Sequence, residues 1–410
     1  MPTVRSAALS GHGAHMIDFD AACSIIHSLP PRVPAERIAL AAAAGRVLAE
    51  PVFAAMDIPR HVISAMDGYA VRDADLARQP ARLRVLGPVL PGQTPPAEIA
   101  PGCCLRVFTG SRVPLCLDRV VVQEQVQREG QYALLPATPP GRSHVRARGS
   151  DLSASDLVLG PGTRIDPRGL VAIAAADAAE VVVYRRPTVA IIATGDELCE
   201  PGSARASENG IPESVSLGVA ASVQRWGGEC VHRARLPDVL HRLEAAAVAA
   251  VDAADLVVVI GGASVGDKDY ARRMFASLGL EILFSKVAIK PAKPVWLGTA
   301  AGKLVFGLPG NPTSAMIAAR LFLAPLLQRI GGGDGGIAAT WMRVPLASAL
   351  GAGGERERFA CATWAYGAVA PLPERDSGAQ SPLVDARLLL RVRPNAAALP
   401  PGALAEALAF

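Results

Sequence analysis

Apolar residues between positions 186 and 330 fall into short runs that alternate about five times with helical stretches. Three of these runs lie at residues 189–192, 256–260 and 304–306, and each is apolar throughout. Such runs are typical of strands that are buried on both faces of a parallel sheet. The pattern predicts an α/β domain with a mostly parallel sheet over residues 186–330.

The remaining segments predict smaller domains. Residues 52–151 contain short β-rich runs between Pro-Gly turns, which predicts a small β domain. Helical patterns at 18–50 and 167–179 predict that this β domain is inserted into a helical linker domain made of residues 16–51 and 152–185. The glycine-rich stretch 331–336 predicts a flexible linker to a C-terminal β domain over 337–410. Residues 1–15 are unpatterned and are expected to be disordered. The predicted fold class is therefore multidomain, α/β plus β.

Composition narrows the possible partners. The net charge of +4, from 41 basic and 37 acidic residues, is too balanced to indicate a nucleic-acid-binding protein. No run of about 18 uninterrupted apolar residues predicts a membrane span, and no basic segment leads into an apolar secretion signal, so a cytoplasmic location is expected. Seven scattered cysteines without a C-x-x-C pair predict reduced thiols.

Polar loops follow the three apolar runs. In an open parallel sheet, loops at the carboxyl ends of the strands line the ligand crevice. One loop carries Glu197, and another carries a glycine-rich segment followed by two aspartates: Gly261, Gly262, Ser264, Gly266, Asp267 and Asp269. Glycines allow a backbone to approach phosphate, whereas carboxylates would repel phosphate unless Mg²⁺ lies between them. The structural alternative is a turn in which an aspartate caps the next helix.

Two further loops suggest anion binding. Lys290 and Lys293 are each followed by proline, which stiffens the backbone and favours an oxyanion site over a solvated basic loop. The third strand is followed by Pro309, Gly310 and Asn311, and Asn311 is placed as a helix N-cap. The capping role alone is enough to explain Asn311. A functional role would add only that the free N–H groups at this helix start face a ligand.

Seven motifs in order resemble those of the molybdopterin molybdenumtransferases, the family of MoeA-type proteins and the gephyrin E domain. The resemblance is clear over residues 20–330 and weak over 331–410. The motifs lie at residues 64–72, 108–110, 121–124, 194–198, 261–269, 289–294 and 308–312.

The resemblance implies an elongated four-domain protomer that forms a homodimer, with a cleft between the α/β domain of one subunit and the small β domain of the other. It implies Mg²⁺-dependent insertion of molybdate into adenylylated molybdopterin, with release of AMP. A molybdopterin adenylyltransferase and apo-molybdoenzymes are implied as partners. Residues carried over by their motifs as catalytic are Asp67, Thr109, Asp151, Glu197, Asp238 and Asp269.

The same resemblance assigns the binding residues. The metal is placed on Asp267, Asp269 and Glu197, and the substrates on the glycine-rich loop, on Lys290 and Lys293, on residues 309–311 and on Arg356. Ser377 and Ser381 compete for a serine that the family places near molybdate.

The chain departs from the family pattern at several positions. An Asp-(Ser/Thr)-Asn element is replaced by residues 212–215, which places Val215 where the family has the asparagine, and Ile63 also stands where the family has asparagine. Cys116-Leu117-Asp118 replaces Gly-Ala-Asp, and Ser150 replaces a glutamate. These changes favour, as an alternative to the enzyme, a non-catalytic paralogue that carries molybdopterin or a nucleotide or acts as a regulator. An unrelated nucleotide-sugar or phosphate-transfer enzyme is the third hypothesis.

Overall fold

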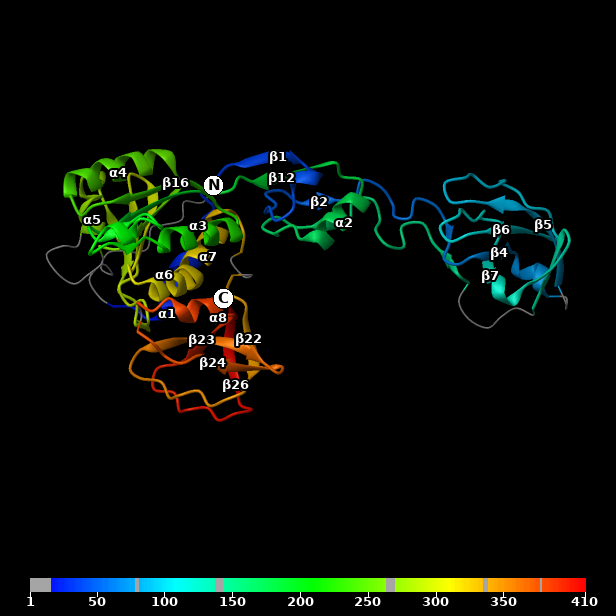
Figure 1. The fold of residues 1–410 in the computed structure, drawn as a ribbon. Helices are drawn as coiled ribbons and strands as arrows, with labels where there is room; N and C mark the ends of the chain where they lie inside the picture. The colour runs from blue at the N-terminus through cyan, green and yellow to red at the C-terminus, as the bar shows by residue number, and fades with distance from the viewer. Residues whose placement is uncertain (1–15, 78–80, 137–142, 263–269, 335–337, 377) are drawn as a thin grey trace.

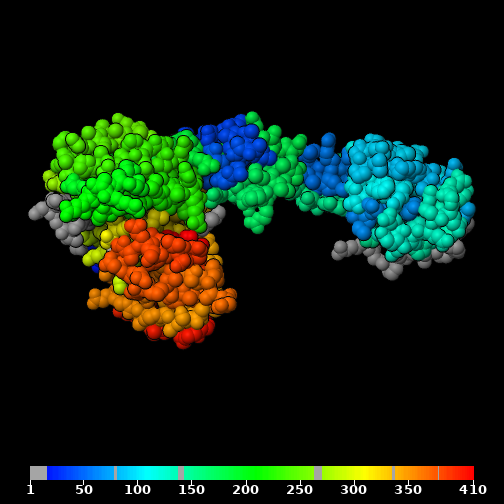
Figure 2. Space-filling model, viewed as in Figure 1, coloured from blue at the N-terminus to red at the C-terminus, as the bar shows by residue number. Residues whose placement is uncertain are grey.

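The computed structural model describes residues 16–77, 81–136, 143–262, 270–334, 338–376 and 378–410. These residues form an elongated molecule (Figure 1). An α/β group and a C-terminal β group lie against each other at one end, and a separate β group lies at the other end. A small linker group stands between them, and two extended segments join it to the distant β group, where the space-filling view is narrow (Figure 2).

The α/β group is built on a six-stranded sheet in the order β16-β13-β17-β21-β20-β18. The first four strands in this order pair in parallel, and β20 pairs antiparallel with both β21 and β18, so the predicted mostly parallel sheet is present. The strands are β13 Thr188–Thr194, β16 Glu229–Leu236, β17 Leu256–Ile260, β18 Glu281–Ser285, β20 Trp296–Ala300 and β21 Lys303–Leu308.

Helices cover both faces of this sheet because successive strand residues point to opposite sides. Ile191 and Val258 belong to a core that includes α3, α6 and α7, whereas Ile192 and Val257 belong to a second core under α4. This two-sided burial explains why the strands are apolar throughout. The helices are α3 Val215–Arg225, α4 Leu240–Ala253, α5 Tyr270–Arg273, α6 Pro312–Ala318 and α7 Ala324–Ile330, and a π-helical turn, Ala319–Leu323, joins the last two.

The distant β group contains a six-stranded sheet in the order β7-β4-β6-β5-β9-β8. Its β-rich runs were predicted, and β5 and β6 pair in parallel while the other neighbours are antiparallel. The strands are β4 Gly68–Val71, β5 Ala81–Val89, β6 Cys103–Val107, β7 Arg119–Val122, β8 Gln127–Glu129 and β9 Tyr132–Leu135. A two-stranded pair, β3 Ile63–Ser64 with β10 Val145–Arg146, lies where the chain enters and leaves this group.

The linker group corrects the helical prediction for residues 18–50. Only α1 Phe19–Ser28 is α-helical there, and residues 35–39 form a strand, β1 Ala35–Ala39, that pairs with β12 Glu180–Tyr184. The alanine-rich composition favours a helix locally, but pairing with a strand some 140 residues later overrides that preference. The group also contains β2 Val52–Phe53, β11 Leu157–Leu159 and the predicted helix, α2 Pro167–Ala175, capped by Asp166.

The helix α1 does not pack in the linker group, contrary to the grouping expected from the sequence. The Phe19 ring lies with its centroid 5.6 Å from that of Phe322 in the α/β group and 4.9 Å from that of Phe359 in the C-terminal group. Asp18 caps the helix by accepting a hydrogen bond from the Ala21 N–H at 2.7 Å. Helix α1 therefore joins the α/β and C-terminal groups through a shared aromatic core.

The C-terminal group is a six-stranded mixed sheet. One of its strands, β19, comes before α6 in the chain. Its order is β19-β23-β25-β26-β22, with β24 paired to β23. The pair β19–β23 is parallel and the others are antiparallel. The elements are β19 Ile289–Lys290, β22 Trp341–Pro345, β23 Glu357–Ala365, β24 Ala368–Pro371, α8 Ser381–Asp385, β25 Leu388–Val392 and β26 Leu404–Ala409.

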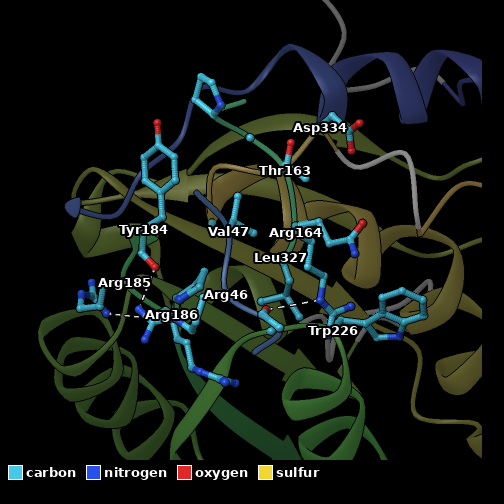
Figure 3. A pocket seen from close by; sticks show the side chains of 18 residues that line it. Arg46, Val47, Thr163, Arg164, Tyr184, Arg185, Arg186, Trp226, Leu327 and Asp334 are labelled. Atoms are coloured by element: carbon cyan, nitrogen blue, oxygen red, sulfur yellow. Dashed lines mark hydrogen bonds between the residues drawn. The ribbon is translucent and has the colours of Figure 1, made fainter. Parts of the chain in front are cut away.

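The prediction of a flexible linker at residues 331–336 is wrong for Gly331, Gly332 and Gly333, which are buried. Gly332 has a φ of +86°, and a Cβ there would lie 2.0 Å from the Tyr184 ring, so the glycine permits close packing of the linker group. Gly331 and Gly333 line a cavity of about 260 Å³ between the linker and α/β groups, together with Arg46 (Figure 3). The segment is thus a packed junction.

Among the described residues, no helix is both long and apolar enough to cross a membrane. The seven cysteines are free thiols. Burial raises the pKa of the Cys104 thiol to about 12, which leaves it protonated and unreactive near neutral pH. The pattern agrees with cysteine used as a small apolar residue.

Candidate active site

A cavity of about 640 Å³ lies at the carboxyl ends of the parallel strands. Loops after β13, β16, β17 and β21 line it, as expected for an open parallel sheet. The predicted site residues in its wall are Glu197, Asp238, Gly261, Gly262, Pro309, Gly310 and Asn311. The structure therefore brings together residues that are separated by more than 100 positions in the sequence.

Hydrogen bonds position the acidic side of this cavity. The Thr194 hydroxyl at the end of β13 donates to one carboxylate oxygen of Asp238, and the backbone N–H of Asp238 donates to Oδ1 of Asp196 at 2.9 Å. The Glu197 carboxylate folds back over Gly195, where a Cβ would lie 2.8 Å from its Oε2. Two neighbouring loops thus hold Glu197 and Asp238 in one wall of the cavity.

Glycines allow the three loops to touch one another. Gly261 has a φ of +92°, and a Cβ on it would lie 2.6 Å from the Thr194 carbonyl oxygen. The Gly261 N–H donates to the Leu308 carbonyl oxygen at 3.1 Å, and a Cβ on Gly310 would lie 3.5 Å from the Cα of Gly261. Close packing of loops therefore accounts for Gly261 whether or not a ligand approaches it.

A second cavity of about 480 Å³ lies between the α/β and C-terminal groups. Lys290, Lys293 and Arg356 line it, and Arg356 Nη1 donates to the Ile289 carbonyl oxygen at 3.3 Å. Residues Pro294, Pro309 and Asn311 line both cavities. The cationic cavity and the acidic cavity therefore adjoin each other and together form the candidate cleft.

Sequence reasoning missed four charged residues in the cationic cavity. They are Arg358, Glu374, Arg375 and Asp376. Arg358 lies two positions after Arg356 on an alternating strand, which is the only local signal for it. Glu374 and its neighbours follow β24 in an irregular segment, where no periodicity indicates which cavity they reach.

Asp67, Thr109 and Asp151 do not reach this cleft within one chain. The first two lie beside β4 and β6 of the distant β group (Figure 1), and Asp151 lies in the chain between β10 and β11, where its N–H donates to the Ile58 carbonyl oxygen at 2.9 Å. Oδ1 of Asp67 accepts from the N–H and hydroxyl of Thr109 at 2.8 and 2.9 Å. The hydrogen bond from the Thr109 backbone N–H, followed by the weaker effect of the bond from the Thr109 hydroxyl, holds the pKa of Asp67 below its usual value. Asp67 and Thr109 thus form one hydrogen-bonded pair.

Several predicted residues lie outside the described ranges: Ser264, Gly266, Asp267, Asp269 and Ser377. Ser381 is the first residue of α8. Within the described ranges, no group of three or more His, Cys, Asp or Glu side chains is arranged to hold a metal ion.

The residues that depart from the family motif have structural roles. Glu213 is 2% exposed, and its Oε1 accepts from the Ser216 N–H at 2.8 Å, which caps α3. Its Oε2 accepts from the Ser216 hydroxyl and lies 3.4 Å from Arg233 Nη1. Val215 is buried in the core below and lines the acidic cavity. The longer acid has therefore become a helix cap.

Comparisons with known proteins match most of the chain. Residues 17–176 match the family described as "MoeA N-terminal region (domain I and II)", and residues 190–329 match the "Probable molybdopterin binding domain". A molybdopterin molybdenumtransferase of Nostoc sp. is 33% identical over 82% of this chain and 79% of its own length. That of Haemophilus influenzae is 33% identical over 82% of this chain and 81% of its own length.

Solved structures show the same architecture. The molybdopterin biosynthesis MoeA protein of Pyrococcus horikoshii superimposes with a TM-score of 0.83 at 25% identity, over 97% of this chain and 100% of that one. A second crystal structure of a MoeA protein from that organism gives 0.78 at 28% identity, over 97% and 99%. The multidomain fold with mixed sheets and helices is therefore shared along nearly the whole chain.

Proposed function

Because this chain belongs to the molybdopterin molybdenumtransferases, a family of transferases in molybdenum cofactor biosynthesis, we propose that it inserts molybdate into adenylylated molybdopterin. In this reaction AMP is released in a Mg²⁺-dependent step. The observation that carries the proposal is the candidate cleft, in which an acidic cavity adjoins a cationic one.

The acidic cavity suits the nucleotide end of the substrate. Glu197 and Asp238 supply carboxylate oxygens, which Mg²⁺ prefers, and the glycine loops supply close approach of the backbone. Mg²⁺ bound there would neutralise the charge of the phosphate that leaves with AMP. Asp267 and Asp269 complete the proposed ligand set.

The cationic cavity suits the oxyanion. Lys290, Lys293 and Arg356 supply positive charge from β19, from the turn after it and from the residue before β23. Because Pro309 and Asn311 line both cavities, an oxyanion in one would lie next to a pterin substrate in the other. Holding both reactants in one cleft would supply much of the rate acceleration by proximity.

We propose a homodimer in which the β group of one subunit closes the cleft of the other. The elongated shape supports this arrangement, because Asp67 and Thr109 stand far from their own cleft (Figure 1). Their pairing would present an ionised carboxylate to the substrate at neutral pH. Asp151 would enter from the same side.

The proposed setting is the cytoplasm. There the substrate would arrive from a molybdopterin adenylyltransferase and the product would pass to apo-molybdoenzymes.

The test is to incubate the purified protein with adenylylated molybdopterin, Mg²⁺ and molybdate, and to measure AMP release and activation of an apo-molybdoenzyme. We expect AMP release that requires molybdate and Mg²⁺, together with an active molybdoenzyme. Tight substrate binding without AMP release would refute insertion and would indicate a carrier or regulator instead. An Asp238→Asn variant, which keeps the hydrogen bond from Thr194 possible, should lose AMP release and retain the fold.

A further inference from the structure

Backbone pairing forces two cations together in the cationic cavity. The parallel pair β19–β23 places Lys290 in register with Arg358. Like charges that face each other on adjacent strands destabilise a sheet. Arg358 is fixed in place, because its Nη2 donates to the Gly351 carbonyl oxygen at 2.7 Å and its side chain is only 13% exposed. Some negative charge is therefore required between these two residues.

Glu374 supplies that charge. Its Oε2 lies 3.4 Å from Lys290 Nζ, and its Oε1 accepts a hydrogen bond from Arg358 Nη1. Burial raises the pKa of Glu374, but the charges of Arg358 and Lys290 outweigh it and hold the pKa below the usual value. Glu374 is thus an ionised carboxylate that occupies the space between two cations of the proposed oxyanion site.

The Glu374 carboxylate can leave its position between Lys290 and Arg358 without a change in the backbone. The Leu372 N–H donates to the Cys361 carbonyl oxygen at 2.8 Å, and the Ala379 carbonyl oxygen accepts from the Thr313 hydroxyl at 2.5 Å. The segment is therefore tethered on both sides of Glu374, whose side chain is 56% exposed. A rotation of this side chain into solvent would vacate the position and leave Arg358 where it is.

We propose that Glu374 is an internal counter-anion of the oxyanion site, which the incoming oxyanion displaces. The proposal rests on the proposed function of the same cleft. A singly charged anion would gain little by replacing a singly charged carboxylate that is already hydrogen-bonded. A doubly charged oxyanion such as molybdate gains twice the attraction from Lys290 and Arg358. Glu374 therefore sets how much anion is needed to fill the site.

The expected effect of removing this charge follows from electrostatics. A unit charge ~6 Å from a doubly charged anion, in surroundings with a dielectric constant near that of water, changes affinity by about tenfold. Replacing Glu374 by glutamine keeps the size and a hydrogen-bond acceptor but removes the charge. The affinity for molybdate should then rise by about tenfold at low ionic strength and by less at high salt.

The experiment is calorimetric titration of the full-length protein with molybdate, without pterin substrate, for wild type and Glu374→Gln. Asp376→Asn is the matched control, because it removes one charge from the same cavity at a residue that bridges no cation pair among the described residues, and the new amide oxygen still accepts from Gly378. We expect Glu374→Gln to bind about tenfold more tightly and Asp376→Asn to change binding less than threefold. Circular dichroism should show an unchanged fold in both variants.

Three results would overturn the proposal: equal affinities of wild type and Glu374→Gln, equal gains in both variants, or no binding of molybdate by any variant. Equal affinities would leave the proposed insertion reaction intact, because binding itself would be present. Conversely, a tenfold gain in Glu374→Gln together with AMP release that does not depend on molybdate would support the counter-anion and refute the proposed function. The two inferences can therefore fail separately.

Discussion

Replacing Glu357 by glutamine should destabilise the joined α/β and C-terminal groups strongly. Glu357 and Arg391 are each 6% exposed at their side chains and form a buried ion pair. Arg391 also binds Asp20 Oδ1 on α1 at 2.6 Å and lies 4.7 Å from the centre of the Phe19 ring. The pair therefore connects β23 and β25 to α1, one residue away from Arg356 and Arg358 in the cationic cavity.

The size of the effect follows from burial. Removing one partner of a buried ion pair costs about 3–5 kcal/mol, because the remaining charge stays buried without full compensation. Asp20 still pairs with Arg391 and glutamine still accepts a hydrogen bond, so we expect about 3 kcal/mol, at the low end. For a denaturant dependence of about 2.5 kcal/mol per molar urea, this lowers the unfolding midpoint by about 1 M.

Tryptophan fluorescence provides the assay. The four tryptophans, at positions 226, 296, 341 and 364, all lie in the α/β and C-terminal groups, so their signal reports unfolding of those groups and not of the distant β group. Glu200→Gln is the matched control, because Glu200 is 58% exposed and pairs with Arg235 at 3.9 Å in the α/β group. A surface pair of this kind contributes about 0–1 kcal/mol. A midpoint for Glu357→Gln no lower than that of the control would refute the reasoning.

Three further predictions concern the site, the pH dependence and the packing. Lys290→Ala should raise the molybdate concentration for half-maximal AMP release by tenfold or more, since a hydrogen bond to a charged group contributes about 1.5–3 kcal/mol; an unchanged requirement would remove Lys290 from the oxyanion site. Burial raises the pKa of Asp255, but hydrogen bonds from Thr188 and from Arg185 outweigh it and the net pKa lies below the usual value. Its stabilisation is therefore present above the usual pKa and is lost as pH falls through the lower folded value. Between about pH 5 and about pH 3 the urea midpoint of Asp255→Asn should fall less than that of wild type, and parallel curves would contradict this. Gly332→Ala places a Cβ 2.0 Å from the Tyr184 ring and should cost about 1–3 kcal/mol or more in urea unfolding; a wild-type midpoint would show that the ring moves aside freely.

The local patterns predicted the central sheet well for a physical reason. Residues 256–260 are buried on both faces and are apolar throughout, so no other assignment satisfies them. The same logic placed Glu197, Gly261 and Asn311 at one edge, because the carboxyl ends of parallel strands meet there. Helix starts were also readable, since Asp166 and Pro167 carry their own capping chemistry.

The predictions from sequence were wrong where contacts with a distant segment of the chain determined the local structure. Residues 35–39 became a strand because β12 pairs with them, and Gly331–Gly333 became buried because Pro187, Tyr184 and Gln328 pack on them. The position of α1 depends on aromatic rings more than 300 residues away, at Phe322 and Phe359. No window of sequence contains such information, because the energy comes from contacts between segments.

The sequence by itself determined the α/β character of residues 186–330, the β character of the segments around it, and the loops that carry acidic, glycine-rich and basic residues. These features follow from periodicity, capping and side-chain chemistry, which act over a few residues. Only the tertiary structure decided that the acidic and cationic cavities share Pro309 and Asn311, and that Glu374 lies between Lys290 and Arg358. The reason is that charge and cavity shape depend on distances in space, and backbone register sets those distances.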